Sequence, residues 1–128
     1  PISTLSSMKI LIAEDDPFLM KVYRMTFEQE GYDIILAEDG EQALFRLKKE
    51  CPDIMLLDIL MPKMDGFDVL REIQKDKKCK HIPIIVLSNL GQETDVAQAK
   101  ELGAVDYAIK GDTDIEDVVK KVKKYVGK

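Results

Sequence analysis

The sequence predicts an α/β protein of the doubly wound type, in which helices cover both faces of one parallel sheet. Apolar runs of strand length recur along the 128 residues, and segments with helical periodicity separate them. Three of these runs consist almost entirely of Ile, Leu, Val and Met, which is typical of strands that are buried on both faces. Strands that alternate with helices in this way form a parallel sheet with crossover helices.

The expected strands are the apolar runs themselves. They are Lys9–Ala13, Ile34–Ala37, Ile54–Leu57, Ile84–Leu87 and Val105–Ile109. No repeat, linker or low-complexity segment divides the sequence. One domain of five strand–helix units is therefore expected.

The first helix is expected directly after the first strand. Asp16 can cap it, because a carboxylate accepts the free N–H groups of a first helical turn. Pro17 suits that turn, where its missing N–H does no harm, and Gly31 is expected to end the helix. The face predicted to be buried comprises Leu19, Val22, Tyr23 and Thr26.

Four further helices follow the other strands. The second begins near Asp39, and the fourth, Gln92–Leu102, is polar, weakly amphipathic and ended by Gly103. The last opens with Thr113 and Glu116 at the spacing of a capping box. The predicted buried faces are Ala43, Leu44 and Leu47 in the second helix, Phe67, Leu70 and Ile73 in the third, and Ile115, Val118, Val119, Val122 and Val126 in the last.

The net charge and hydrophobicity of the sequence argue against nucleic acid and membrane as direct partners. The net charge of −5 argues against a nucleic-acid surface, and no apolar run approaches the roughly 18 residues of a membrane span. Residues 1–7 are expected to be disordered and lack the features of a secretion signal, so a cytoplasmic location is expected. Cys51 and Cys79 lack a metal-ligand spacing and are expected to be reduced thiols.

Polar residues follow four of the predicted strands where each strand ends. Glu14 and Asp15 follow the first strand, Asp58 the third, Ser88 the fourth and Lys110 the fifth. Ligands of such sheets bind beyond the carboxyl ends of the strands, and oxygen ligands without His or Cys favour Mg²⁺. An aspartate can attack phosphorus, and a cation, an ammonium and a hydroxyl can each meet one oxygen of the transferred group. The strand ends therefore predict phosphoryl chemistry with Mg²⁺.

These residues resemble the receiver domain of two-component response regulators, including the chemotaxis regulators. The motifs that carry the resemblance are Glu14-Asp15 after KILIA, Asp58 with the segment Met61–Gly66, Ser88 after PIIVL, and Lys110 after Tyr107-Ala108-Ile109. The resemblance covers the chain from about Met8 to Val126 and implies a receiver domain over residues 8–128. It also implies the flavodoxin-like strand order 2-1-3-4-5.

The resemblance implies a role for each strand-end residue. Asp58 would be phosphorylated by a sensor histidine kinase or a histidine phosphotransfer protein. Ser88 would bind the phosphoryl group, and Lys110 would pair first with Asp58 and then with that group. Tyr107 would turn inward as Ser88 moves. The implied Mg²⁺ ligands are Glu14, Asp15, Asp58 and the backbone carbonyl of Leu60.

The resemblance also implies where the signal leaves the domain. Phosphorylation would alter the face formed by the fourth helix, the fifth strand and the last helix, which would bind a downstream protein or a second copy of the chain. The chain would be a regulator and not an enzyme, and it would contact neither nucleic acid nor membrane directly.

Two positions depart from the family pattern and leave alternatives open. Gly111 stands where the family usually has proline, and Asn89 where it usually has a smaller residue. Since a cis bond without proline costs about 3 kcal/mol, the Lys110–Gly111 bond is expected to be trans. One alternative is a pseudo-receiver that binds partners and never takes phosphate. The other is a Mg²⁺-dependent phosphohydrolase with an aspartyl phosphate, although Leu60 stands where such enzymes usually carry a second acid.

Overall fold

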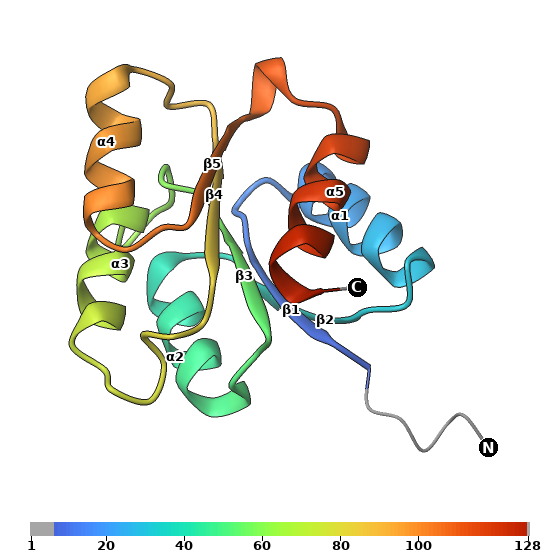
Figure 1. Cartoon of the computed structure of the whole chain (residues 1–128), viewed down its shortest axis with the longest axis horizontal. Helices are drawn as coiled ribbons and strands as arrows, with labels where there is room; N and C mark the ends of the chain where they lie inside the picture. The colour runs from blue at the N-terminus through green and yellow to red at the C-terminus, as the bar shows by residue number, and fades with distance from the viewer. Residues whose placement is uncertain (1–6, 128) are drawn as a thin grey trace.

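The computed structural model of the chain describes residues 7–127, and it confirms the predicted doubly wound fold (Figure 1). One parallel sheet has the order β2-β1-β3-β4-β5. Its strands are β1 (Lys9–Ala13), β2 (Asp33–Ala37), β3 (Ile54–Leu57), β4 (Ile84–Ser88) and β5 (Asp106–Ile109). The helices are α1 (Pro17–Gln29), α2 (Gly40–Glu50), α3 (Gly66–Gln74), α4 (Glu93–Glu101) and α5 (Ile115–Val126).

Two hydrophobic cores lie on opposite faces of the sheet. Helices α2, α3 and α4 cover one face, and α1 and α5 cover the other (Figure 1). Because side chains alternate along a strand, Leu11 and Met55 enter the first core, while Ile10 and Ile54 enter the second. The sheet is therefore buried on both faces, as the continuous apolar runs predicted.

Helix boundaries follow the expected caps at α1 and α2 but not at α5. The Asp16 side chain accepts the N–H groups of Phe18 and Leu19, and Asp39 caps α2. The predicted capping box from Thr113 is wrong, because the N-cap of α5 is Asp114 and makes no side-chain capping bond. A short 3₁₀ turn at Lys110–Asp112 leaves Thr113 extended, which moves the start of the helix one residue further along.

The buried residues of α1 differ in part from those predicted. Tyr23 is buried, but the next buried residue is Phe27, which is fully enclosed and packs edge-to-face on Tyr32. Val22 and Thr26 are only half-buried. The spacing of four residues between Tyr23 and Phe27 defines the line that meets the sheet, so Phe27 belonged in the predicted core.

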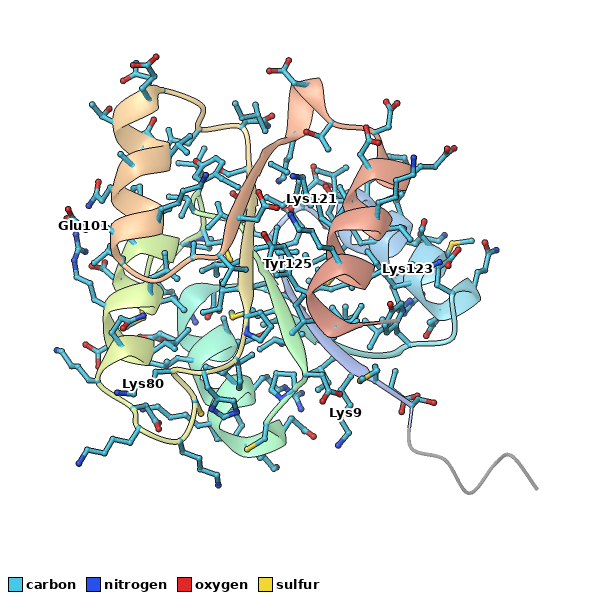
Figure 2. The ribbon with its side chains drawn as sticks, viewed as in Figure 1. Lys9, Lys80, Glu101, Lys121, Lys123 and Tyr125 are labelled. Atoms are coloured by element: carbon cyan, nitrogen blue, oxygen red, sulfur yellow. The ribbon has the colours of Figure 1, made fainter. Side chains whose placement is uncertain are left out.

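Two ion pairs connect α5 to its neighbours. Lys121 and Tyr125 both lie on α5 (Figure 2). Lys121 Nζ lies 3.2 Å from Asp106 Oδ2, and the Tyr125 hydroxyl lies 3.2 Å from the same oxygen. Burial works to raise the pKa of Asp106, but the N–H of Tyr107 and the Lys121 ammonium outweigh it and lower that pKa. Lys123, also on α5, places its Nζ 2.7 Å from Glu30 Oε1. The partly buried pair with Asp106 holds α5 to the sheet edge, whereas the exposed pair with Glu30 lies beside the end of α1 and contributes little.

The expected disordered segment, residues 1–7, lies outside the described residues except for Ser7. Within the described part of the chain, every helix is too short or too polar to cross a bilayer.

Candidate functional site

The register of the sheet brings the predicted site residues to one edge. Ala13 pairs with Leu57, so Glu14 and Asp58, the residues that follow, leave the sheet side by side. The Asp58 N–H donates to the Ala13 carbonyl at 3.1 Å, which fixes the two strand ends relative to each other. An open cleft of about 470 Å³ lies at this edge. It is lined by Glu14, Asp15, Asp16, Pro17, Leu19, Asp58, Leu60, Asn89 and Lys110.

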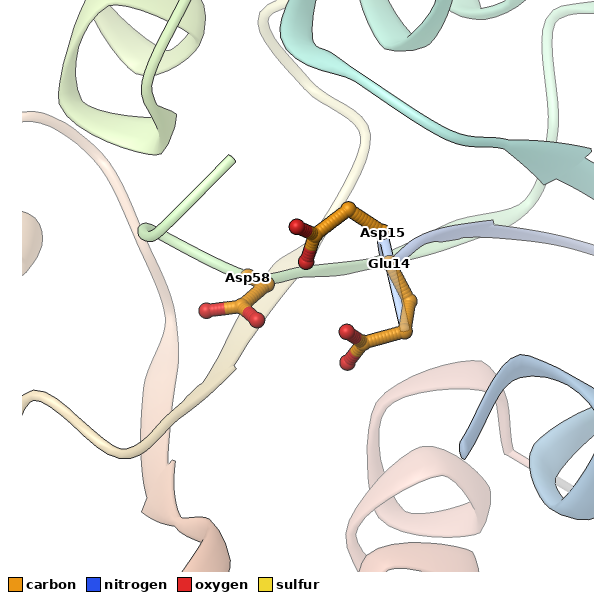
Figure 3. A group of neighbouring side chains, drawn as sticks. All are labelled: Glu14, Asp15 and Asp58. Carbon is orange, nitrogen blue, oxygen red and sulfur yellow. The ribbon is translucent and has the colours of Figure 1, made fainter. Parts of the chain in front are cut away.

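Three carboxylates form an acidic cluster in this cleft. Glu14, Asp15 and Asp58 each offer an oxygen, and these oxygens all lie within 4.8 Å of one another (Figure 3). Glu14 and Asp58 are 2% and 4% exposed, whereas Asp15 is exposed to solvent. Burial raises the pKa of Glu14, although hydrogen bonds from Lys110 and the Asp16 N–H oppose that rise. Hard oxygen donors at this separation fit Mg²⁺ better than zinc.

Lys110 bridges the two buried carboxylates. Its Nζ lies 2.6 Å from Glu14 Oε1 and 2.7 Å from Asp58 Oδ2, and its side chain is 11% exposed. Burial disfavours the charged ammonium, but the hydrogen bonds to Asp58 and Glu14 raise the pKa of Lys110 above its usual value. The sequence predicted the contact with Asp58, whereas the equally short contact with Glu14 was not foreseen.

Both oxygens of Asp58 are engaged. Oδ2 accepts from Lys110, and Oδ1 accepts the N–H of Leu60 at 3.0 Å. Leu60 therefore lines the cleft beside the acidic cluster, with its side chain 52% exposed. Its backbone lies next to the cluster, where the sequence predicted a carbonyl ligand.

The loop after Asp58 depends on a glycine for reasons of space. A Cβ on Gly66 would lie 2.7 Å from the Asp58 carbonyl oxygen and 2.7 Å from the Ile59 Cα. The Gly66 N–H donates to the Ile59 carbonyl at 2.9 Å. The start of α3 can therefore sit against the backbone that carries Asp58 only because residue 66 has no side chain.

Ser88 and Tyr107 meet at the backbone of Leu90. Ser88 is fully buried, and its Oγ accepts the Leu90 N–H at 3.3 Å. The Tyr107 ring is 9% exposed, and its hydroxyl donates to the Leu90 carbonyl. Tyr107 thus occupies an inward position that ties β5 to the loop after β4.

The two departures from the family pattern leave the strand-end residues in place. Among residues 7–127 every peptide bond is trans, which confirms the expectation for Lys110–Gly111. A Cβ on Gly111 would meet nothing within 4 Å, and Asn89 lines the cleft.

Tyr23 is a residue near the site that was predicted only as part of the core. It is 7% exposed, and together with Glu14 and Asp58 it lines a narrow void beneath the acidic cluster. Burial raises the pKa of its hydroxyl to about 12. A tyrosine on an otherwise apolar helix face was the available signal, since its polar tip usually needs a partner.

Comparison with known proteins gives matches over most of the chain. A family model described as the response regulator receiver domain matches residues 10–123. The probable transcriptional regulator ycf27 of Guillardia theta is 42% identical over 102 residues, which make up 80% of this chain and 39% of that protein. The chain therefore spans about two-fifths of the length of this curated relative.

Solved structures match over almost their whole length. The receiver domain of the Francisella response regulator 1452 has a TM-score of 0.88 and 28% identity, with 94% of this chain and 98% of that chain covered. A chain of the CheX-CheY-BeF3-Mg+2 complex from Borrelia burgdorferi has a TM-score of 0.86 and 34% identity, with 97% and 92% covered. The similarity thus extends through β1 to α5 and includes every strand end described above.

Proposed function

Since the chain belongs to the family of response regulator receiver domains, we propose that it accepts a phosphoryl group on Asp58 in the presence of Mg²⁺. The donor is a sensor histidine kinase or a histidine phosphotransfer protein. The observation that carries the proposal is the juxtaposition of Asp58 with two further carboxylates and the Lys110 ammonium at one edge of the sheet. An exposed cleft at that edge gives a donor access to them.

In this proposal Asp58 is the nucleophile. A carboxylate oxygen forms a bond to phosphorus while the P–N bond to the donor's imidazole breaks, and the electron pair remains on that nitrogen, which takes a proton. Lys110 leaves the carboxylate and pairs with an oxygen of the transferred group. Ser88 gives up the Leu90 N–H and binds another oxygen.

Mg²⁺ would be held by Glu14, Asp15, Asp58 and the carbonyl of Leu60. When bound, the ion would neutralise charge on the carboxylates and on the transferred group. The donor set supports this assignment, because it consists of oxygen atoms within a short distance of one another.

Replacing Asp15 is the clearest test of the metal site. Asp15 is exposed, so Asp15→Asn removes one charge with little effect on packing. A unit charge near a protein surface interacts with a cation by about 1–4 kcal/mol, so the Kd for Mg²⁺ is expected to rise about tenfold or more. Calorimetric titration with Mg²⁺ measures this change.

Glu38→Gln is the matched control for this experiment. Glu38 is an exposed acid beyond β2 that lies outside the acidic cluster, and its variant should bind Mg²⁺ as the wild type does. Mg²⁺ should raise the Tm of both the wild type and the control, and a chelator should reverse the rise. Equal Kd values for wild type and Asp15→Asn would contradict the proposed ligand set.

We propose that the signal leaves through α4, β5 and α5. The contacts of Ser88 and Tyr107 with Leu90 support this route, because a shift of Ser88 would change the backbone to which Tyr107 is bonded. The face would bind a downstream protein or a second copy of the chain. Direct contact with nucleic acid is not proposed for this chain. The relative ycf27 is a probable transcriptional regulator, but this chain spans only 39% of its length.

Tyr107→Phe tests this route without disturbing the packing of the ring. The substitution removes only the hydroxyl that bonds to Leu90. A neutral hydrogen bond contributes about 1 kcal/mol, so the equilibrium constant for the inward position of Tyr107 is expected to fall about fivefold, which lowers the population with Tyr107 inward. Amide chemical shifts of α4, recorded before and after addition of beryllofluoride and Mg²⁺, report that population. Shift changes in α4 as large as in the wild type would count against the route.

Treatment with acetyl phosphate and Mg²⁺, followed by mass spectrometry of the intact protein, tests the function itself. The expected result is the gain of one phosphoryl group. An unchanged mass would favour the pseudo-receiver alternative, and steady turnover of a model phosphate ester would favour the phosphohydrolase. The Gly111 and Asn89 departures offer the pseudo-receiver little support, because neither removes a carboxylate or the ammonium from the site.

A further inference from the structure

A narrow void lies under the acidic cluster and has no room for a water molecule. Glu14 and Asp58 line it from above and Tyr23 from α1, and the remaining lining is aliphatic side chains of β1, β3 and β4. Tyr23 is therefore the only lining residue whose side chain can donate a hydrogen bond. A carboxylate that needs a donor on this side cannot obtain it from solvent.

The direction of α1 points the Tyr23 side chain toward the carboxylates. Helical side chains lean toward the N-terminus of their helix, and α1 begins at the cleft, where Asp16 caps it beside Glu14. The charges of Lys110, Glu14 and Asp58 all act on the Tyr23 hydroxyl. Within residues 7–127 burial and charges act on that hydroxyl, and no hydrogen bond is among these influences, so it can still donate one.

Glu14 loses a partner when the site is phosphorylated as proposed. Its Oε2 accepts the Asp16 N–H at 3.0 Å, and its Oε1 accepts Lys110 at 2.6 Å. If Lys110 follows the phosphoryl group, Glu14 keeps the Asp16 N–H and the proposed Mg²⁺, but it loses the ammonium at a position that is 2% exposed. A carboxylate offers about four acceptor sites, so the departure of Lys110 leaves a buried acceptor site without a donor, which is destabilising.

We propose that Tyr23 is a positioning residue of the phosphorylated state, in which its hydroxyl donates to Glu14 as Lys110 turns to the phosphoryl group. This inference rests on the proposed phosphorylation of Asp58. Tyr23 does not touch the transferred group. It stabilises the arrangement in which Lys110 is released, and it makes no such contact in the unphosphorylated protein.

Tyr23→Phe isolates the hydroxyl, because the ring that packs in the core is kept. The test is a titration with beryllofluoride, a mimic of the phosphoryl group, at saturating Mg²⁺. A hydrogen bond to a charged group corresponds to a change of about tenfold or more in an equilibrium constant. The Kd for beryllofluoride is therefore expected to rise about tenfold, while the Kd for Mg²⁺ alone and the Tm of the free protein stay unchanged.

Tyr125→Phe is the matched control, since it removes a tyrosine hydroxyl that bonds to Asp106 away from the cleft. Its Kd for beryllofluoride should equal that of the wild type. An unchanged Kd in Tyr23→Phe would overturn the inference. A parallel loss of Mg²⁺ affinity and Tm would also overturn it, because it would indicate a packing role. If the wild type gains no mass from acetyl phosphate, that result would instead contradict the proposed function.

A second measurement needs no substitution in the protein under test. With ¹³Cζ-labelled tyrosine, the ring carbon that carries each hydroxyl reports its hydrogen bonding, and the two Phe variants assign the signals of Tyr23 and Tyr125. Addition of beryllofluoride and Mg²⁺ to the wild type is expected to shift the Tyr23 signal and leave the Tyr125 signal in place. A Tyr23 signal that does not move would refute the inference.

Discussion

Asp58→Asn is expected to abolish phosphorylation by acetyl phosphate completely. The substitution replaces the proposed nucleophile with an amide, which does not attack phosphorus, and it leaves the size of the side chain almost unchanged. The neighbouring carboxylates cannot take over. Glu14 is held by Lys110 and the Asp16 N–H, and the hydrogen bonds of the Lys110 ammonium go to Glu14 and Asp58 and not to exposed Asp15. Intact-protein mass spectrometry after incubation with Mg²⁺ measures the result.

Asp68→Asn provides the matched control for this loss. Asp68 is an exposed acid on α3 that pairs with Arg71 on its own helix, and an exposed pair of this kind contributes little to stability. Its variant should gain the same mass as the wild type. Phosphate on Asp58→Asn at wild-type yield would show that another residue is the acceptor.

Lys110→Met is expected to lower the free energy of unfolding as well as the rate of phosphoryl transfer. The variant leaves Glu14 and Asp58 as two buried carboxylates with no counter-charge between them. Removal of one member of a buried ion pair costs about 3 kcal/mol or more. Urea unfolding at neutral pH measures the loss, and Mg²⁺ should restore part of it, because the ion can replace the ammonium as a counter-charge.

Lys123→Met makes the same change at an ion pair of similar length on the surface. Lys123 lies 2.7 Å from Glu30, but both side chains are well exposed, so its loss should have little effect. A Lys110→Met variant as stable as Lys123→Met would show that the buried bridge contributes nothing to the fold. Equal stability with and without Mg²⁺ in Lys110→Met would argue against an ion in the acidic cluster.

The fold was predictable because its signals are local. Strand β3 is a continuous apolar run, and α1 begins with an N-cap at Asp16 and a proline at residue 17. Both elements could therefore be placed from the sequence alone. The failed cap at Thr113 shows the limit of this reasoning. The 3₁₀ turn at Lys110–Asp112 depends on how the chain leaves the sheet, and no local pattern encodes that geometry.

The candidate site was predictable to the level of strand ends and no further. Parallel strands deliver the residues that follow them to one edge, and this rule gathered Glu14, Asp58 and Lys110 correctly. Which oxygen the Lys110 ammonium binds, and which side chain lies beneath the cluster, depends on helix packing. The bridge to Glu14 and the position of Tyr23 therefore required coordinates.

Helix α4, which forms part of the proposed partner-binding face, has the fewest buried residues of the five helices. Only Ala99 of α4 is fully buried, whereas α5 buries three valines and is also held by the partly buried pair of Lys121 with Asp106. Local unfolding free energy follows the amount of buried apolar surface, so α4 is expected to unfold locally at a lower free energy than the other helices. If Asp58 is phosphorylated as proposed, the limited energy of that event would change the structure most readily at this helix.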